Sequence, residues 1–119
     1  MKFKILGEVM QTASVELRAN ETIFAESSAM QWMTDNVSMK SSIRGGLGAG
    51  LGRMFSGESL FLNEFSLKEG SGGLVSFSTE FPGKILSFEL KEGQTLIAQK
   101  DAFMAADESV KLEVHFRKK

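Results

Sequence analysis

The sequence predicts an all-β protein, either a β-sandwich or a double-stranded β-helix. Short segments alternate between apolar and polar residues with a period of two, which is typical of strands that bury one face. Residues that favour turns separate these segments. The sequence of residues 17–26 also resembles that of residues 90–99, which indicates an internal repeat. No helix of normal length is needed, because glycines disfavour one even between residues 43 and 55.

This alternation predicts the positions of the strands along the chain. Phe3 and Ile5 alternate with Lys2 and Lys4, and the segment 13–17 alternates in the same way before a turn at 19–21. In the first half we expect strands at residues 2–5, 12–18, 22–25, 28–33 and 37–40. In the rest we expect strands at residues 60–67, 75–77, 86–90, 95–98 and 110–116, the last with the clearest alternation.

The repeat relates Leu17–Glu26 to Leu90–Gln99, which lie 73 positions further along without a gap. Asn20 in the first turn corresponds to Gly93 in the second, and these residue types tolerate a positive φ best. Further identical pairs at this spacing are Ser14 and Ser87, Glu16 and Glu89, Ala29 and Ala102, and Val37 and Val110. We therefore expect two internally repeated hairpin units within a single domain of residues 1–119. The repeat-like halves are about residues 2–42 and 75–117, packed against each other, with a glycine-rich connector at 43–58.

Composition narrows the function classes. The chain has 119 residues, 42% of them hydrophobic, which is typical of one globular domain. A net charge of -1 argues against nucleic-acid binding, and the absence of cysteine removes disulfides and thiolate metal sites. No apolar run approaches the roughly 20 residues of a membrane span. We expect a cytoplasmic protein, while peripheral contact with a membrane stays open.

The sequence contains no recognisable catalytic set. His115 is the only histidine, and its place in the alternation points it outward, away from any partner that would orient a general base. The carboxylates are scattered, and no serine lies in a Gly-x-Ser-x-Gly motif. Trp32, between Met30 and Met33, is expected in the core, with an exposed tryptophan that stacks on a ligand as the alternative. The prediction is that the protein is not an enzyme and has no cofactor or bound metal.

The glycine-rich stretch offers the one candidate site. Five glycines between residues 45 and 52 are flanked by two arginines, and successive backbone N–H groups can hold an anion. The spacing matches neither a dinucleotide fingerprint nor a phosphate loop, so a packed connector that contributes to a subunit contact is favoured. The candidate ligand or interface residues are Arg44, Gly45, Gly46, Leu51, Arg53 and Glu58.

Several short strings resemble the AIM-twenty-four family (altered inheritance of mitochondria). They are residues 26–30 (ESSAM), 45–47 (GGL), Arg53, residues 56–59 (SGES) with Phe61, residues 82–83 (PG), and Gln99 with residues 102–105 (AFMA). Ser28 departs from the pattern, since glycine is expected there. The resemblance implies a fold like that of the tryptophan RNA-binding attenuation protein, usually assembled into symmetric oligomers, and family members are commonly longer. It does not imply RNA binding, because no matching basic cluster is present. The sequence does not start with an Arg-rich amphipathic presequence, so among members of such a family a bacterial protein is expected.

These observations favour a non-enzymatic binding or scaffold domain that acts as a homo-oligomer. The alternative is a small-ligand or anion-binding domain that uses the glycine-rich segment and Arg53.

Overall fold

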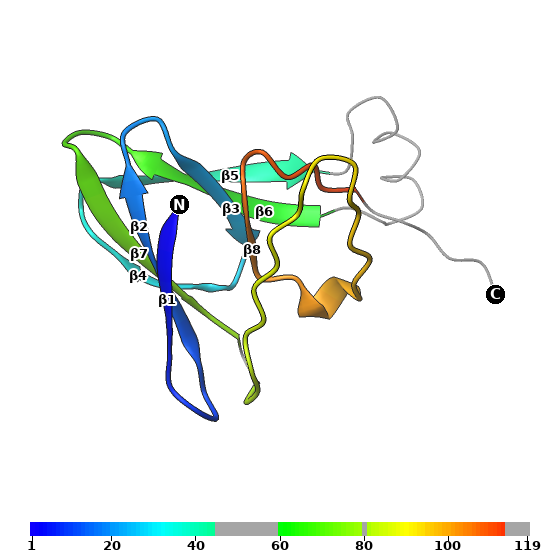
Figure 1. The fold of residues 1–119 in the computed structure, drawn as a ribbon. Helices are drawn as coiled ribbons and strands as arrows, with labels where there is room; N and C mark the ends of the chain where they lie inside the picture. The colour runs from blue at the N-terminus through cyan, green and yellow to red at the C-terminus, as the bar shows by residue number, and fades with distance from the viewer. Residues whose placement is uncertain (45–59, 80, 114–119) are drawn as a thin grey trace.

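The computed structural model describes residues 1–44, 60–79 and 81–113, and these form two four-stranded antiparallel sheets (Figure 1). The first sheet has the order β1-β2-β7-β4 and the second the order β5-β6-β3-β8. The strands are β1 Lys2–Leu6, β2 Thr12–Arg18, β3 Thr22–Glu26, β4 Met30–Met33, β5 Val37–Arg44, β6 Leu60–Leu67, β7 Gly72–Ser78 and β8 Ala105–Asp107. Within the described ranges the only helix is the short 3-10 helix η1, Lys100–Ala102.

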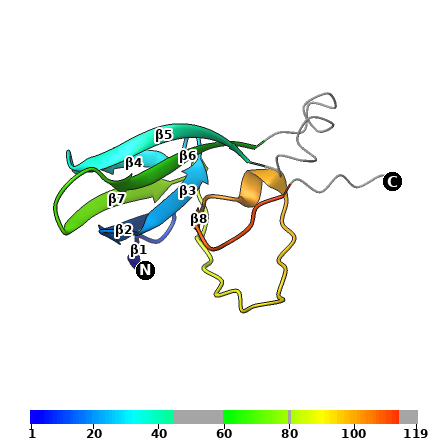
Figure 2. The ribbon, with the colours of Figure 1, turned by 90° about the horizontal axis from the view of Figure 1, so that it is seen from above.

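The chain passes from one sheet to the other between β2 and β3. β2 pairs with β1 on one side and β7 on the other, whereas β3 pairs with β6 and β8. The two strands are therefore joined by a tight turn without pairing with each other. This arrangement, visible from above in Figure 2, places the two sheets face to face as a sandwich.

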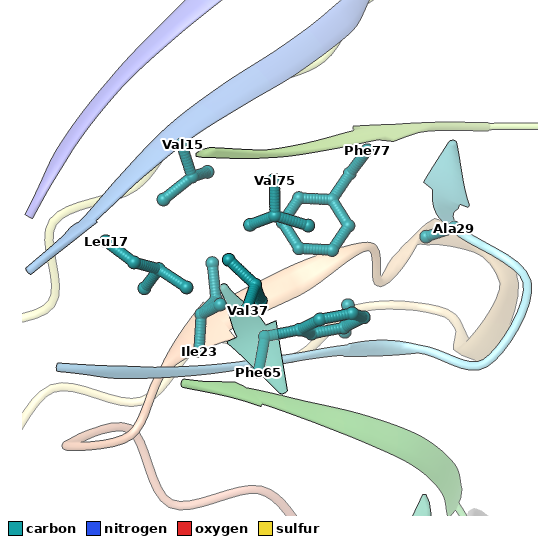
Figure 3. Packing of buried hydrophobic residues seen from close by; sticks show 9 residues of the cluster. Val15, Leu17, Ile23, Ala29, Val37, Phe65, Val75 and Phe77 are labelled. Atoms are coloured by element: carbon teal, nitrogen blue, oxygen red, sulfur yellow. The ribbon is translucent and has the colours of Figure 1, made fainter. Parts of the chain in front are cut away.

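The core lies between the sheets, and it forms because alternate residues of each strand point inward. β2 and β7 contribute from the first sheet, and β3, β5 and β6 from the second (Figure 3). The buried cluster consists of Val15, Leu17, Ile23, Ala25, Ala29, Val37, Phe65, Val75 and Phe77. Met30 and Met33 of β4 pack against its edge.

A hydrogen-bonded clamp joins the two turns at one end of the sandwich. The Asn36 side-chain amide donates to the carbonyl oxygens of Gly72 at 2.8 Å and Glu69 at 3.2 Å. The Thr34 hydroxyl donates to Asn36 Oδ1 at 2.7 Å and accepts from the backbone N–H of Leu74 at 3.0 Å. These bonds fix the β4–β5 turn against the β6–β7 turn, so they position strands of both sheets.

The all-β sandwich is confirmed, and three local expectations are wrong: the pair of strands at 86–90 and 95–98, the start of the C-terminal strand, and the burial of Trp32. The segments 86–90 and 95–98 form no strands, because no neighbouring strand pairs with them in the described structure. Residues 110–113 are also not a strand, and the rest of that predicted element, with His115, lies outside the described residues.

Trp32 is the third correction, since its side chain is 48% exposed. β4 has an irregular register between Met30 and Trp32, so Met30 and Met33 face the core while Trp32 lies opposite Ser76 on the other face of the sheet.

Candidate functional site

Most of the site predicted from the glycine-rich stretch cannot be located. Gly45, Gly46, Leu51, Arg53 and Glu58 lie outside the described residues. The sixth candidate, Arg44, is the last residue of β5, and its backbone is the register partner of Leu60 in β6. The stretch thus begins and ends at one end of a single antiparallel strand pair. The anion-binding interpretation of this stretch stays a prediction.

Within the part of the chain that the structure describes, the side chains give little sign of catalytic or metal chemistry. No group of three or more His, Cys, Asp or Glu side chains is placed to hold a metal ion. Every buried side-chain nitrogen or oxygen there has a hydrogen-bond partner. Among these residues, no unsatisfied polar group therefore points to a bound ligand.

The repeat identified in the sequence leads to an apolar surface. Its first copy, residues 13–26, is named here the first arch and consists of β2, a turn and β3. In the turn, Asn20 has a φ of 72°, the Glu21 N–H donates to the Arg18 carbonyl at 3.1 Å, and Glu21 Oε1 accepts from the Arg18 N–H at 2.8 Å. The left-handed residue and the side-chain cap together redirect the chain from one sheet to the other.

The second copy, residues 86–99, has the same turn and is named here the second arch. Gly93 has a φ of 86°, the Gln94 N–H donates to the Lys91 carbonyl at 2.9 Å, and Gln94 Oε1 accepts from the Lys91 N–H at 2.8 Å. Two later turns also repeat at the same spacing. Their N–H to carbonyl bonds are Ala29 to Glu26 and Ala102 to Gln99, then Val37 to Thr34 and Val110 to Asp107. The similarity therefore extends from sequence to backbone hydrogen bonding.

The two arches differ in what surrounds them. In the first arch, the inward residues are at most 3% exposed; they are Val15, Leu17, Ile23 and Ala25. Their equivalents in the second arch are Phe88, Leu90, Leu96 and Ala98, of which the first three are 60%, 38% and 48% exposed. Ala98 is exposed as well. The same apolar pattern that forms the core in one copy is thus left open to solvent in the other.

The second arch lies beside β8 and outside the two sheets, as the yellow and orange part of the ribbon shows (Figures 1 and 2). The residues just before the second arch are attached to the β1–β2 loop. The Gly83 N–H donates to the Val9 carbonyl at 2.6 Å, and the Ile85 N–H donates to Gln11 Oε1 at 2.6 Å. Phe81, Val9 and Met10, next to these bonds, are also largely exposed.

Sequence reasoning did not select the second arch as a site. The available signal was the repeat itself, because one chain of this length cannot surround both copies with the same strands. Six large apolar residues of this part of the chain are exposed: Phe81, Leu86, Phe88, Leu90, Leu96 and Ile97. A gathering of exposed apolar side chains is a candidate for a contact with another macromolecule. The structure therefore places the candidate functional surface at residues 81–97.

Comparison with known protein families shows to which family the chain is related. The model of the family described as mitochondrial biogenesis AIM24 matches residues 3–119. The chain belongs to the AIM24 family. This confirms the resemblance drawn from its short motifs, while likeness to the tryptophan RNA-binding attenuation protein stays a prediction.

A solved structure of a Streptococcus pyogenes protein has the same fold as this AIM24 chain. The TM-score is 0.62 with 24% sequence identity, over 91% of this chain and 50% of the other. The chain thus spans about half the length of that relative. No curated protein matches the chain. Among the described residues, no helix is long and apolar enough to span a membrane.

Proposed function

We propose that this AIM24-family chain is a non-enzymatic scaffold domain that self-associates, with the second arch as its contact surface. The observation that carries the proposal is the exposure of Phe88, Leu90 and Leu96, whose equivalents in the first arch are in the core. Apolar area removed from water stabilises an association by about 25 cal/mol per Å² before the costs of association are counted. The absence from the sequence of cysteine and of a nucleophile motif supports a role in binding over catalysis.

The first experiment is native mass spectrometry, with light scattering over protein concentrations from about 1 µM to about 1 mM. This range covers association free energies of about -8 to -4 kcal/mol. We expect a discrete oligomer whose population rises with concentration. A protein that stays monomeric over the whole range would contradict the proposal.

A matched pair of variants then tests the surface. Leu96 in the second arch and Trp32 on the outer face of β4 are both 48% exposed, so neither substitution by Asp removes a core side chain. Leu96→Asp should weaken self-association at least tenfold, because it places a charge in the apolar contact, whereas Trp32→Asp should leave it unchanged. An oligomer that tolerates Leu96→Asp would place the contact elsewhere.

A further inference from the structure

The second arch has unpaired backbone as well as exposed side chains. Within the described residues, 86–90 and 95–98 make no backbone hydrogen bonds, although both segments are long enough for a strand. Their counterparts in the first arch are β2 and β3, which have a paired strand on either side. A backbone segment without hydrogen-bond partners can take up an additional strand.

The strand most suited to this addition is one that the same fold already carries. Among the described strands, β1 is at the edge of its sheet: it pairs with β2 on one side, and no described strand pairs with its other side. Its side chains are exposed along most of its length, including Phe3 at 47% and Leu6 at 53%. The open side of β1 and the unpaired segment 86–90 of a second copy allow a contact between two copies.

The pairing of β1 with β2 supplies a register for this contact. Backbone groups of successive residues point to alternate sides of a strand, so the free side of β1 keeps this register when it adds to the side of 86–90 that corresponds to the β7 side of β2. In the β1–β2 pairing Phe3 is the register partner of Val15, and Lys2 is the register partner of Glu16. The equivalents of these two β2 residues in the second arch are Phe88 and Glu89.

We propose that β1 of a second copy of this chain adds to residues 86–90 as an antiparallel strand. Phe3 then lies opposite Phe88, Lys2 opposite Glu89, and Ile5 opposite Leu86. This inference rests on the proposed self-association and names the strands that form the contact.

The chemistry of these pairs favours a second copy over an unrelated partner. An aromatic pair and an opposite-charge pair directly across two antiparallel strands are both stabilising. The equivalent of Ser14, the register partner of Lys4 in the β1–β2 pair, is Ser87, so Lys4 again meets a small polar residue. The addition of an edge strand to an open backbone is an established mode of recognition, in which main-chain hydrogen bonds supply affinity and alternate side chains supply specificity.

Cross-linking tests this register directly, because the sequence has no cysteine and each introduced thiol is then unique. Paired residues of antiparallel strands have Cα atoms about 4.5–5.5 Å apart, within the range that a disulfide spans. Phe3→Cys and Phe88→Cys proteins are mixed under mild oxidation, and a disulfide-linked heterodimer is expected. The matched control replaces Phe88→Cys with Trp32→Cys, which should give no linked product above the level of random collision.

The possible outcomes distinguish the strand addition from the self-association on which it rests. A monomeric protein would overturn both. An oligomer that gives no more Phe3–Phe88 product than the control would overturn the strand addition and leave self-association standing. In the oligomer, Phe88→Asp should raise the dissociation constant at least tenfold relative to Trp32→Asp, and equal values for the two variants would also overturn the strand addition. Circular dichroism spectra of both variants establish that they are folded.

Discussion

The rings of Phe65 and Phe77 meet edge to face across the centre of the sandwich, with centroids 5.3 Å apart and an interplanar angle of 76°. Phe65 belongs to β6 in one sheet and Phe77 to β7 in the other, and both are fully buried. An edge-to-face arrangement places the positive edge of one ring against the negative face of the other. This contact therefore links the two sheets directly.

The first prediction concerns the energy of this ring pair. Phe65→Leu and Phe77→Leu should each lower the free energy of unfolding, because each leaves space in the core and removes the ring contact. The double variant should lose about 0.5–1.5 kcal/mol less than the sum of the two single losses, since the ring contact can be lost only once. Chemical denaturation of the four proteins measures this coupling.

The exposed Phe61→Leu variant, in the same strand as Phe65, is the control for the ring pair. Its stability should change by less than about 0.5 kcal/mol, because the residue is 63% exposed. Strictly additive losses at residues 65 and 77 would mean that the rings do not interact in solution.

Two adjacent glycines provide a second prediction. A Cβ atom added at Gly73 would lie 2.7 Å from Leu67 Cδ2 and 3.0 Å from both Asn36 Oδ1 and Thr34 Oγ1. Gly73→Ala should therefore destabilise the protein by about 1–3 kcal/mol, through overpacking. Gly72→Ala is the matched control, because its new Cβ would have only the Leu17 carbonyl oxygen nearby, at 4.0 Å. Thermal unfolding of the two variants should differ clearly, and equal melting temperatures would contradict the close packing at residue 73.

The Asn36 clamp leads to a third prediction. Asn36→Ala removes the two bonds to the β6–β7 turn and leaves the Thr34 hydroxyl with only the longer bond to the Leu74 carbonyl, at 3.4 Å. The expected loss of stability is about 1–3 kcal/mol. Asp35→Ala, at an exposed neighbour in the same turn, should have almost no effect. If both variants unfold at the same denaturant concentration, the clamp does not contribute to the stability of the sandwich.

The first half of the chain could be predicted closely from sequence because its strands have partners. Alternation in residues 13–17 placed Val15 and Leu17 inward, and both are buried. The same alternation in residues 86–90 predicted a strand that the structure lacks. Local pattern reports which face of an extended segment is apolar, whereas a strand also requires a neighbour to accept its hydrogen bonds. That neighbour cannot be read from the segment itself.

Trp32 and the candidate surface illustrate the same limit. Alternation within a four-residue strand is too short to reveal a change of register, so the apolar neighbours Met30 and Met33 suggested burial for Trp32 as well. The repeat, by contrast, was visible in the sequence and correctly related the two turns. The sequence did not show that the apolar residues of the second arch are exposed. That difference depends on the strands that pair with β2 and β3 and have no counterpart around the second arch.

The final prediction uses the pair of equivalent turn residues, Asn20 and Gly93. For an L-residue other than glycine, the left-handed conformation costs about 1–2 kcal/mol, and asparagine is among those that tolerate it best. Asn20→Ala should therefore destabilise the protein by about 1 kcal/mol, whereas Asn20→Gly, which installs the residue of the second turn, should be tolerated. Gly93→Ala should have a smaller effect on global unfolding than Asn20→Ala, because the arms of the second arch are not part of the core. Urea denaturation of the three variants provides the measurement. A loss of stability for Gly93→Ala equal to that for Asn20→Ala would mean that the second arch is as firmly integrated into the fold as the first.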